Sequence, residues 1–232
     1  MSALTLCARM GENERGPQMD EARSQAPQYR TIEGPVTATL VEKKSRFLCL
    51  LAPVQDEDEV QAQLFAIKKE HWSANHHCYA YRLQDGSERA SDDGEPSGTA
   101  GRPMLHVLSG QGLTGVLAVV TRYFGGTLLG AGGLVRAYSG AVAAAVQAAQ
   151  IVTFAVHERY LLPLDYAEYE RVRSLLASEP GWRVEEAFTD VVTLTLTVPE
   201  EDAARAHKRI TALTRGTGHA RPVERLWLPR KT

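Results

Sequence analysis

Residues 116–140 read VLAVVTRYFGGTLLGAGGLVRAYSG: an apolar run, a glycine-rich turn and a nearly uncharged helical pattern. Between Ser91 and Gly140 lie 12 of the chain's 19 glycines. Glycine is used where the backbone needs a positive φ or where another group approaches it closely. The continuous apolar run Val116–Val120 predicts a strand buried on both faces, and Ala131–Ala149 predicts a buried helix packed on the sheet. The stretch therefore predicts a strand, a shaped turn and a helix.

Upstream of this stretch the pattern predicts further strands and helices. Asp56 and Glu59 have the spacing of a capping box, and apolar residues follow at helical intervals. The predicted strands are Val36–Glu42, Arg46–Val54 and His77–Leu83, and the predicted helices are Asp56–His71 and Thr99–Ser109. Residues 1–28 are polar and irregular, so we expect a disordered N-terminal extension. A mixed β/α domain is expected over residues 29–150.

The second half of the chain has a more regular pattern. The run VVTLTLTV within Val191–Val198 alternates strictly, as a half-buried strand does. The predicted strands are Val152–Pro163, Arg183–Phe188, Val191–Val198 and Ala220–Leu228, and the predicted helices are Asp165–Ser178 and Glu200–Leu213. The order βαββαβ is that of the ferredoxin-like arrangement. We therefore expect an α+β protein of two domains, with a boundary near Gln150 and a ferredoxin-like domain over residues 151–232.

The composition of the chain limits the classes of protein to which it can belong. The chain has 232 residues, 44% hydrophobic and 23% charged, which is typical of a globular protein. No apolar run approaches the roughly 20 residues that span a bilayer, and the N-terminus lacks a secretory signal pattern, so we expect a cytoplasmic protein without a membrane partner. The scattered Cys7, Cys49 and Cys78 favour neither a disulfide framework nor a structural zinc site.

Charge is unevenly distributed along the chain. The net charge of −2 excludes a globally basic nucleic-acid binder, but residues 205–232 carry eight Lys or Arg against the single acid Glu224. A local basic face of this kind can contact RNA phosphates. The candidate nucleic-acid contacts are Arg205, Lys208, Arg209, Arg215 and Arg221. The alternative is an ordinary solvated helix and tail.

The glycine-rich turn has the ingredients of an anion site. Arg122 and Tyr123 end the apolar strand, and the turn leads into the N-terminus of the buried helix, whose N–H groups favour an anion. Arg122 and Arg136 can add phosphate contacts. The spacing matches neither the GxGxxG nor the GxxxxGK[ST] pattern. The alternative is that the glycines let the helix pack closely on the strand.

Two further groups carry polar chemistry. Asp92, Asp93 and Glu95 can hold a hard cation through waters, act as general acid and base, or cap the next helix and pair with arginine. His76 and Cys78 share one face of the predicted strand. The alternatives for them are a nucleophilic pair, half of a metal site, or inert packing in the core. We predict no catalytic residue, metal or cofactor. The candidate binding residues are Asp92, Asp93, Gly94, Glu95, Thr99, Arg122, Tyr123, Gly125, Gly126, Gly130, Gly132, Gly133 and Arg136.

Four strings resemble the signature of the IMPACT family, in its bacterial YigZ-type branch. They are KKSRF at Lys43–Phe47, HHCYAY at His76–Tyr81, SDDGEPSGTAGRPML at Ser91–Leu105 and VVTRYFGGTLLGAGGLVRAY at Val119–Tyr138. The resemblance is strong over residues 29–150. It implies a first domain with the fold of domain IV of elongation factor G and of one small-subunit ribosomal protein, which has an unusual left-handed βαβ crossover. It also implies a second domain like the ferredoxin-like domains of that factor.

The resemblance implies a role in translation rather than a reaction. Our leading hypothesis is a translation-associated regulatory protein that binds RNA or the ribosome through the glycine-rich and acidic motif face and the basic C-terminal segment. One alternative is a metal- and phosphate-dependent enzyme that uses the loops Asp92–Glu95 and Gly125–Gly133, because the first fold is shared with small-molecule kinases. The other alternative is an adaptor that docks a protein partner. The sequence identifies neither a small-molecule ligand nor an oligomeric state.

Overall fold

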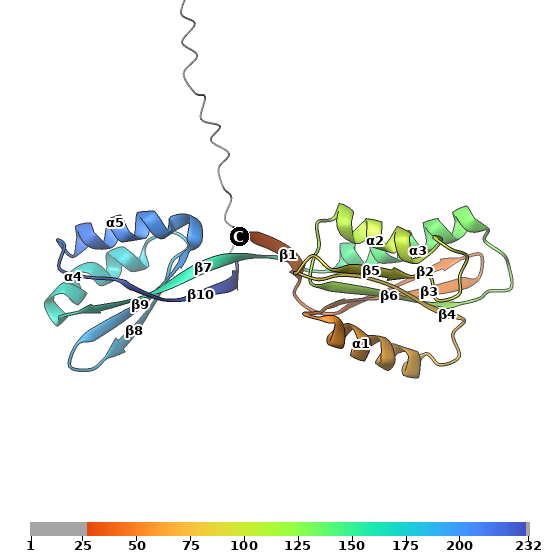
Figure 1. Ribbon diagram of the computed structural model, residues 1–232, viewed down its shortest axis with the longest axis horizontal. Helices are drawn as coiled ribbons and strands as arrows, with labels where there is room; N and C mark the ends of the chain where they lie inside the picture. Colours follow the sequence, from red (N-terminus) through yellow and green to blue (C-terminus); the bar gives the residue numbers. More distant parts are fainter. Residues whose placement is uncertain (1–26, 231–232) are drawn as a thin grey trace, which may run out of the picture.

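The computed structural model describes residues 27–230 and divides them between two five-stranded sheets with packed helices (Figure 1). The expected disordered extension, residues 1–28, lies outside the described residues except for Pro27 and Gln28. The two-domain α+β architecture is confirmed. Among the described residues, no helix is both long and apolar enough to span a membrane.

The first sheet places the predicted doubly buried strand at its centre. Its order is β2-β3-β6-β4-β5, and every neighbouring pair is antiparallel. The strands are β2 (Val36–Glu42), β3 (Ser45–Pro53), β4 (His76–Arg82), β5 (Glu88–Ser91) and β6 (Val116–Tyr123). β6 is buried from Val116 to Arg122, because strands flank it and helices cover both faces of the sheet.

Helices lie on both faces of this sheet (Figure 1). α1 (Glu57–Glu70) covers one face with Val60, Leu64 and Ile67, which pack on apolar residues of β6 and β4. The predicted capping box is present in part: Asp56 accepts from the Glu59 N–H at 2.9 Å, but the Glu59 carboxylate accepts from the Gln55 N–H at 2.8 Å rather than from that of Asp56. α2 (Gly101–Gly110) and α3 (Ala131–Ala148) cover the opposite face and form the larger core. The prediction of a buried α3 is confirmed for its sheet-facing side.

The second domain has the ferredoxin-like strand order β10-β7-β9-β8, all antiparallel. Its elements are β7 (Ile151–Leu164), α4 (Tyr166–Ala177), β8 (Arg183–Phe188), β9 (Val192–Pro199), the 3-10 turn η1 (Glu200–Asp202), α5 (Ala203–Leu213) and β10 (Arg221–Pro229). The alternation predicted for β9 is confirmed, since Val192, Leu194 and Leu196 are buried in the core beneath α4 and α5.

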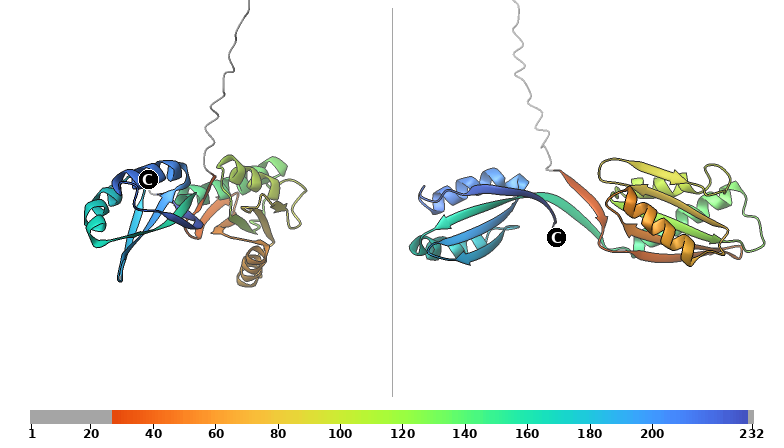
Figure 2. Two further views of the ribbon diagram at one scale, coloured as in Figure 1. Left: turned by 60° about the vertical axis from the view of Figure 1, so that its left-hand side comes forward. Right: turned by 60° about the horizontal axis from the view of Figure 1, so that its bottom comes forward.

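One strand near the start of the described chain joins the second sheet. β1 (Gln28–Ile32) pairs antiparallel with the first residues of β7, although our sequence analysis begins the first domain at residue 29. β1 also contacts the first domain, because the Thr114 N–H donates to the Arg30 carbonyl at 2.8 Å and the Arg30 guanidinium donates to the Gln111 carbonyl at 2.7 Å. Figure 2 shows β1 and the start of β7 running between the two domains. Pairing over such a separation leaves no local pattern, so sequence periodicity does not reveal it.

Candidate functional site

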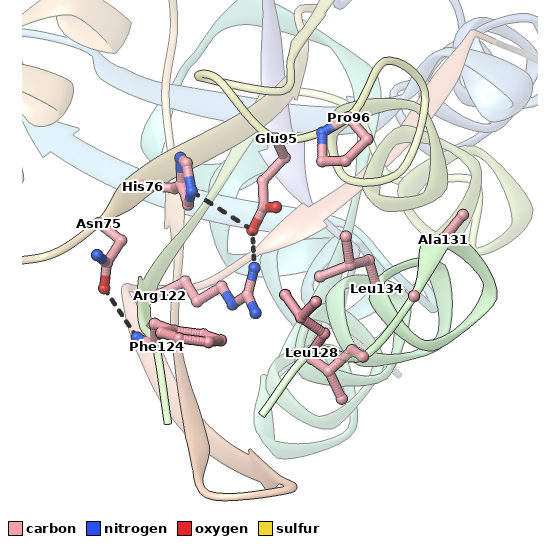
Figure 3. A pocket seen from close by; sticks show the side chains of 11 residues that line it. Asn75, His76, Glu95, Pro96, Arg122, Phe124, Leu128, Ala131 and Leu134 are labelled. Atoms are coloured by element: carbon pink, nitrogen blue, oxygen red, sulfur yellow. Dashed lines mark hydrogen bonds and ion pairs between the residues drawn. The ribbon is translucent and has the colours of Figure 1, made fainter. Parts of the chain in front are cut away.

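The glycine-rich turn borders a cavity of about 420 Å³ at one end of the first sheet (Figure 3). Here β6 ends, β4 begins and α3 starts. The lining residues are Asn75, His76, Glu95, Pro96, Arg122, Phe124, Leu128, Leu129, Gly130, Ala131 and Leu134. The cavity therefore joins Glu95 of the acidic motif to Arg122 and Gly130 of the glycine-rich stretch.

A buried ion pair lies in the wall of the cavity. Arg122 Nη1 is 2.5 Å from Glu95 Oε1, and the two side chains are 7% and 3% exposed. The Tyr138 hydroxyl donates to the same oxygen at 2.7 Å, and His76 Nε2 lies 3.9 Å from it. Burial, then the neighbouring Cys78 and Glu95, raise the pKa of Tyr138, so its hydroxyl stays a donor. Glu95 is thus held by charge and hydrogen bonds from several directions.

The guanidinium of Arg122 is also held by two aromatic rings. Its Cζ lies 5.4 Å from the centroid of Phe47 and 5.7 Å from that of Phe124, within cation–π range. Its Nε is buried and has no hydrogen-bond partner among the described residues. This nitrogen has almost no accessible surface, so a molecule in the cavity does not reach it, and the ion pair with Glu95 and the two rings hold the guanidinium in place.

Asp92 organises backbone rather than lining the cavity. Its Oδ1 accepts from the N–H groups of Ala100 and Gly101 at 3.0 and 2.8 Å, and its Oδ2 accepts from Gly98 at 2.8 Å. Burial by itself would raise the pKa of Asp92, but these three donors hold that pKa below its ordinary value. Asp92 therefore serves the start of α2, as the structural alternative of our sequence analysis describes.

Asp93 ties the same loop to the start of β4. Its Oδ2 accepts from the His77 N–H at 2.6 Å, and its carbonyl lies 2.8 Å from His76 Nδ1. Its φ is +44°, and Gly94 follows at +86° beneath the His76 ring. Lys68 Nζ is 3.8 Å from Asp93 Oδ1. The loop thus positions His76 at the cavity.

The glycines of the turn serve two purposes. A Cβ on Gly125 would lie 2.1 Å from the carbonyl carbon of Lys44, so the tip of the β2–β3 hairpin approaches this backbone closely. Gly130 has φ +72° and begins α3 without a side-chain cap, and a Cβ there would meet nothing within 4 Å. Gly125 therefore packs the turn, whereas Gly130 leaves open space at the N-terminus of α3.

The remaining predicted residues lie outside the cavity lining. Thr99 donates to the Pro96 carbonyl at 2.6 Å, and the Tyr123 hydroxyl is 3.0 Å from His71 Nδ1 on the α1 side of the sheet. Arg136 is exposed on α3 and has no ion pair among the described residues. Three of the predicted glycines of this stretch are likewise absent from the cavity lining: Gly126, Gly132 and Gly133. Arg122, rather than Arg136, is the arginine of the site.

His76 and Cys78 share a face of β4 but form no catalytic pair. The Cys78 thiol donates to the Asp92 carbonyl at 3.0 Å, and burial raises its pKa to about 12. His77 points to the other face, 3.1 Å from Thr121 Oγ1, and burial lowers its pKa. The described residues contain no group of three or more His, Cys, Asp or Glu placed to hold a metal ion. A Cys78 that stays protonated is a packing residue.

The basic segment of the second domain is largely occupied by its own acids. Arg205 and Arg209 both pair with Glu179, at 2.6 and 2.7 Å, and Arg205 also pairs with Asp202. Further along, Arg225 and Arg230 pair with acids of η1. Three predicted contacts have side chains with no hydrogen bond or ion pair within residues 27–230: Lys208, Arg215 and Arg221.

Two sets of exposed side chains at this end of the first domain were not predicted from the sequence. Phe65 and Trp72, seven residues apart, are 72% and 82% exposed beside Lys68 and Lys69 of α1. Their helical spacing was the available signal, because apolar residues on the polar side of an amphipathic helix need a reason. On the turn, Phe124 and Leu128 are 46% and 82% exposed at the cavity mouth.

Comparisons with known proteins match both halves of the chain. The Impact N-terminal domain matches residues 43–146, and a domain of unknown function, DUF1949, matches residues 162–217. The IMPACT family member YvyE of Bacillus subtilis is 37% identical over 202 residues, 86% of this chain and 93% of that protein. The IMPACT family member YigZ of Escherichia coli is 36% identical over 187 residues, 79% of this chain and 92% of that protein. A crystal structure of a hypothetical protein is 32% identical with a TM-score of 0.55, over 85% of this chain and 98% of that one.

Proposed function

The chain belongs to the IMPACT family, and from this premise we propose that it regulates translation by binding structured RNA of the ribosome. The binding surface is the glycine-loop end of the first domain. The family signature covers this end, since residues 43–146 include the tip of the β2–β3 hairpin, α1, the cavity and the start of α3. The following observations support an RNA partner.

The observation that carries the proposal is the exposed stripe of α1. Phe65, Lys68 and Lys69 stand at i, i+3 and i+4, and Trp72 continues the spacing just beyond the C-cap His71. Residues at these intervals share a helix face. Exposed aromatic rings interleaved with lysines suit an RNA strand, because bases stack on the rings while ammonium groups neutralise phosphates. Lys68 lies 3.8 Å from Asp93 Oδ1, so Lys69 offers the freer charge of the two. The lysines also interact favourably with the negative C-terminal end of the helix dipole, but that interaction does not explain why the rings of Phe65 and Trp72 are exposed.

A second basic element lies against the glycine loop. Lys43 and Lys44 form the tip of the β2–β3 hairpin and are exposed. The guanidinium of Arg46 lies 5.6 Å from the centroid of the Tyr123 ring, and the Tyr123 hydroxyl reaches His71 at the end of α1. Tyr123 therefore connects the hairpin to the stripe, and basic and aromatic groups continue across one end of the domain.

The second domain has a smaller part in this proposal. Because Arg205 and Arg209 are paired with Glu179, they offer less free charge than their number in the sequence implies. Lys208, Arg215 and Arg221 are expected to add salt-dependent, sequence-independent attraction. Removal of these three charges should weaken binding to all RNA sequences equally and reduce the slope of log K against log salt.

The test is binding of the full chain to ribosomes and to a structured ribosomal RNA fragment, measured by co-sedimentation and fluorescence anisotropy over a salt series. Trp72→Ala should weaken binding about tenfold, because loss of a stacking platform costs about 1–3 kcal/mol. Phe188→Ala is the matched control, since Phe188 is an exposed ring of the second domain. A Lys43→Ala/Lys44→Ala double variant should reduce the slope of log K against log salt by about two. Absence of association even at low salt, or equal losses in Trp72→Ala and Phe188→Ala, contradicts the proposal.

A further inference from the structure

The cavity beside the glycine loop has one polar wall and one apolar wall. Arg122 and Glu95 form the polar wall, and Leu128 and Leu134 face them across the cavity (Figure 3). At about 420 Å³ it has the size of a small-molecule pocket rather than of a packing defect. It opens at the same end of the domain as the exposed stripe of α1.

The polar wall offers a donor beside an acceptor. Glu95 Oε1 is occupied by Arg122 and Tyr138, whereas Oε2 accepts no hydrogen bond among the described residues. Arg122 is 6% exposed; its Nη1 donates to Glu95, and its Nη2 makes no hydrogen bond among the described residues. Because the two charges neutralise each other, the wall suits a neutral ligand that has both donors and acceptors on one edge.

The apolar wall and the mouth suit a flat ring. Leu128 is 82% exposed and Phe124 46% exposed, and both line the cavity. A planar ring that enters between them covers apolar surface that otherwise faces water. The combination of aromatic and aliphatic faces with polar groups at one edge is how unstacked bases of RNA are held.

We propose that the cavity takes one unstacked guanine base. Guanine presents adjacent N–H donors on its Watson–Crick edge, for which Glu95 Oε2 is the free acceptor, and the acceptors O6 and N7, to which Arg122 Nη2 can donate. The base site itself rests on the cavity. Only the source of the base, an RNA strand, rests on the proposed function.

The phosphate of the same nucleotide has a place at the start of α3. This helix has 18 residues and begins at Gly130, where a Cβ would meet nothing within 4 Å and no side chain caps the helix. Free N–H groups and the positive end of the helix dipole favour a phosphate there. Gly130 and Ala131 line the same cavity, so a phosphate at this helix end lies beside a base held in it.

The experiment measures anisotropy of labelled hexaribonucleotides with the full chain: a uridine hexamer and three versions in which one central uridine becomes guanosine, adenosine or cytidine. The guanosine hexamer should bind about tenfold more tightly than the others. Glu95→Gln should abolish that preference, because an amide N–H then faces a donor of guanine. Leu128→Ala, at an exposed position, should weaken the guanosine hexamer severalfold without lowering the melting temperature. Leu175→Ala, an exposed leucine of α4, is the matched control.

The outcomes separate this inference from the proposed function. Trp72→Ala should weaken all four hexamers equally and leave the guanosine preference unchanged. If the four hexamers bind alike and Leu128→Ala has no effect while Trp72→Ala still weakens RNA binding, the guanine site is refuted and the proposed function stands. Thermal stabilisation by GMP that Leu128→Ala removes, with no binding of any RNA, supports the base site and refutes RNA as its source. Loss of a protein partner rather than of RNA in Leu128→Ala refutes the inference.

Discussion

Glu95 and Arg122 stand 27 positions apart in the sequence, and their side chains meet at 2.5 Å with less than a tenth of either exposed. Glu95→Gln should reduce the free energy of unfolding by about 3–5 kcal/mol, because it leaves a buried guanidinium without its counter-charge. Chemical denaturation at neutral pH measures the loss. Glu88→Gln is the matched control, since its pair with Arg82 is half-exposed and should contribute less than about 1 kcal/mol. Equal small losses in both variants would show that the buried pair is screened by solvent.

Asp92→Asn should destabilise the protein in a pH-dependent way. The amide presents N–H groups to backbone donors, so we expect a loss of about 1–3 kcal/mol at pH 7. The folded-state pKa of Asp92 lies below its ordinary value of 3.8, so the stabilisation by the carboxylate is complete above that value and disappears as the pH falls through the folded pKa. The free energy of unfolding should therefore fall more between pH 7 and pH 3 for the native chain than for the variant. Asp190→Asn, at an exposed turn, should change the free energy of unfolding at neither pH.

Gly125→Ala should disrupt the junction between the hairpin and the glycine loop. The added Cβ would lie 2.1 Å from the carbonyl carbon of Lys44, and since backbone cannot rotate away, the hairpin has to move. A fall in melting temperature, together with weaker RNA binding, is expected. Gly34→Ala is the matched substitution, because a Cβ there meets nothing within 4 Å and the φ is not left-handed. If both variants melt alike, the close approach of Lys44 is not required.

Cys49 and Cys78 should resist thiol reagents in the folded protein. Burial raises the pKa of each thiol to about 12, so the reactive thiolate is scarce at pH 8. In a Cys7→Ser variant, Ellman's reagent should detect almost no thiol until guanidinium unfolds the chain, and then both. Rapid labelling without denaturant would show that one of these strands opens readily.

Much of the fold follows from local pattern in the sequence. The alternation of β9 and the N-cap at Asp56 each have a local physical cause, and the structure contains both. The pairing of β1 with β7 joins residues that lie about 120 positions apart, and β5 is only four residues long, so neither had a local signal.

The candidate site was predictable in composition but not in geometry. Residues 92–95 hold three carboxylates that are equivalent in the sequence. In the structure, Asp92 and Asp93 accept hydrogen bonds from backbone N–H groups, and only Glu95 lines the cavity. Which carboxylate turns inward depends on the left-handed backbone at Asp93 and Gly94. The pairing of Glu179 with Arg205 and Arg209 likewise joins α5 to the turn after α4, and no charge count reveals it.

The position of β1 has a consequence for how the two domains are connected. The chain passes between them twice, once after Ile32 and once before Ile151, and the Glu33 N–H donates to the Gln150 carbonyl at 2.9 Å where the two passages lie side by side. A double connection resists twisting more than a single linker does, so relative motion of the domains is limited to bending. For the same reason, a single proteolytic cut between Gln150 and Ile151 would leave the fragments associated, held by β1 in the second sheet.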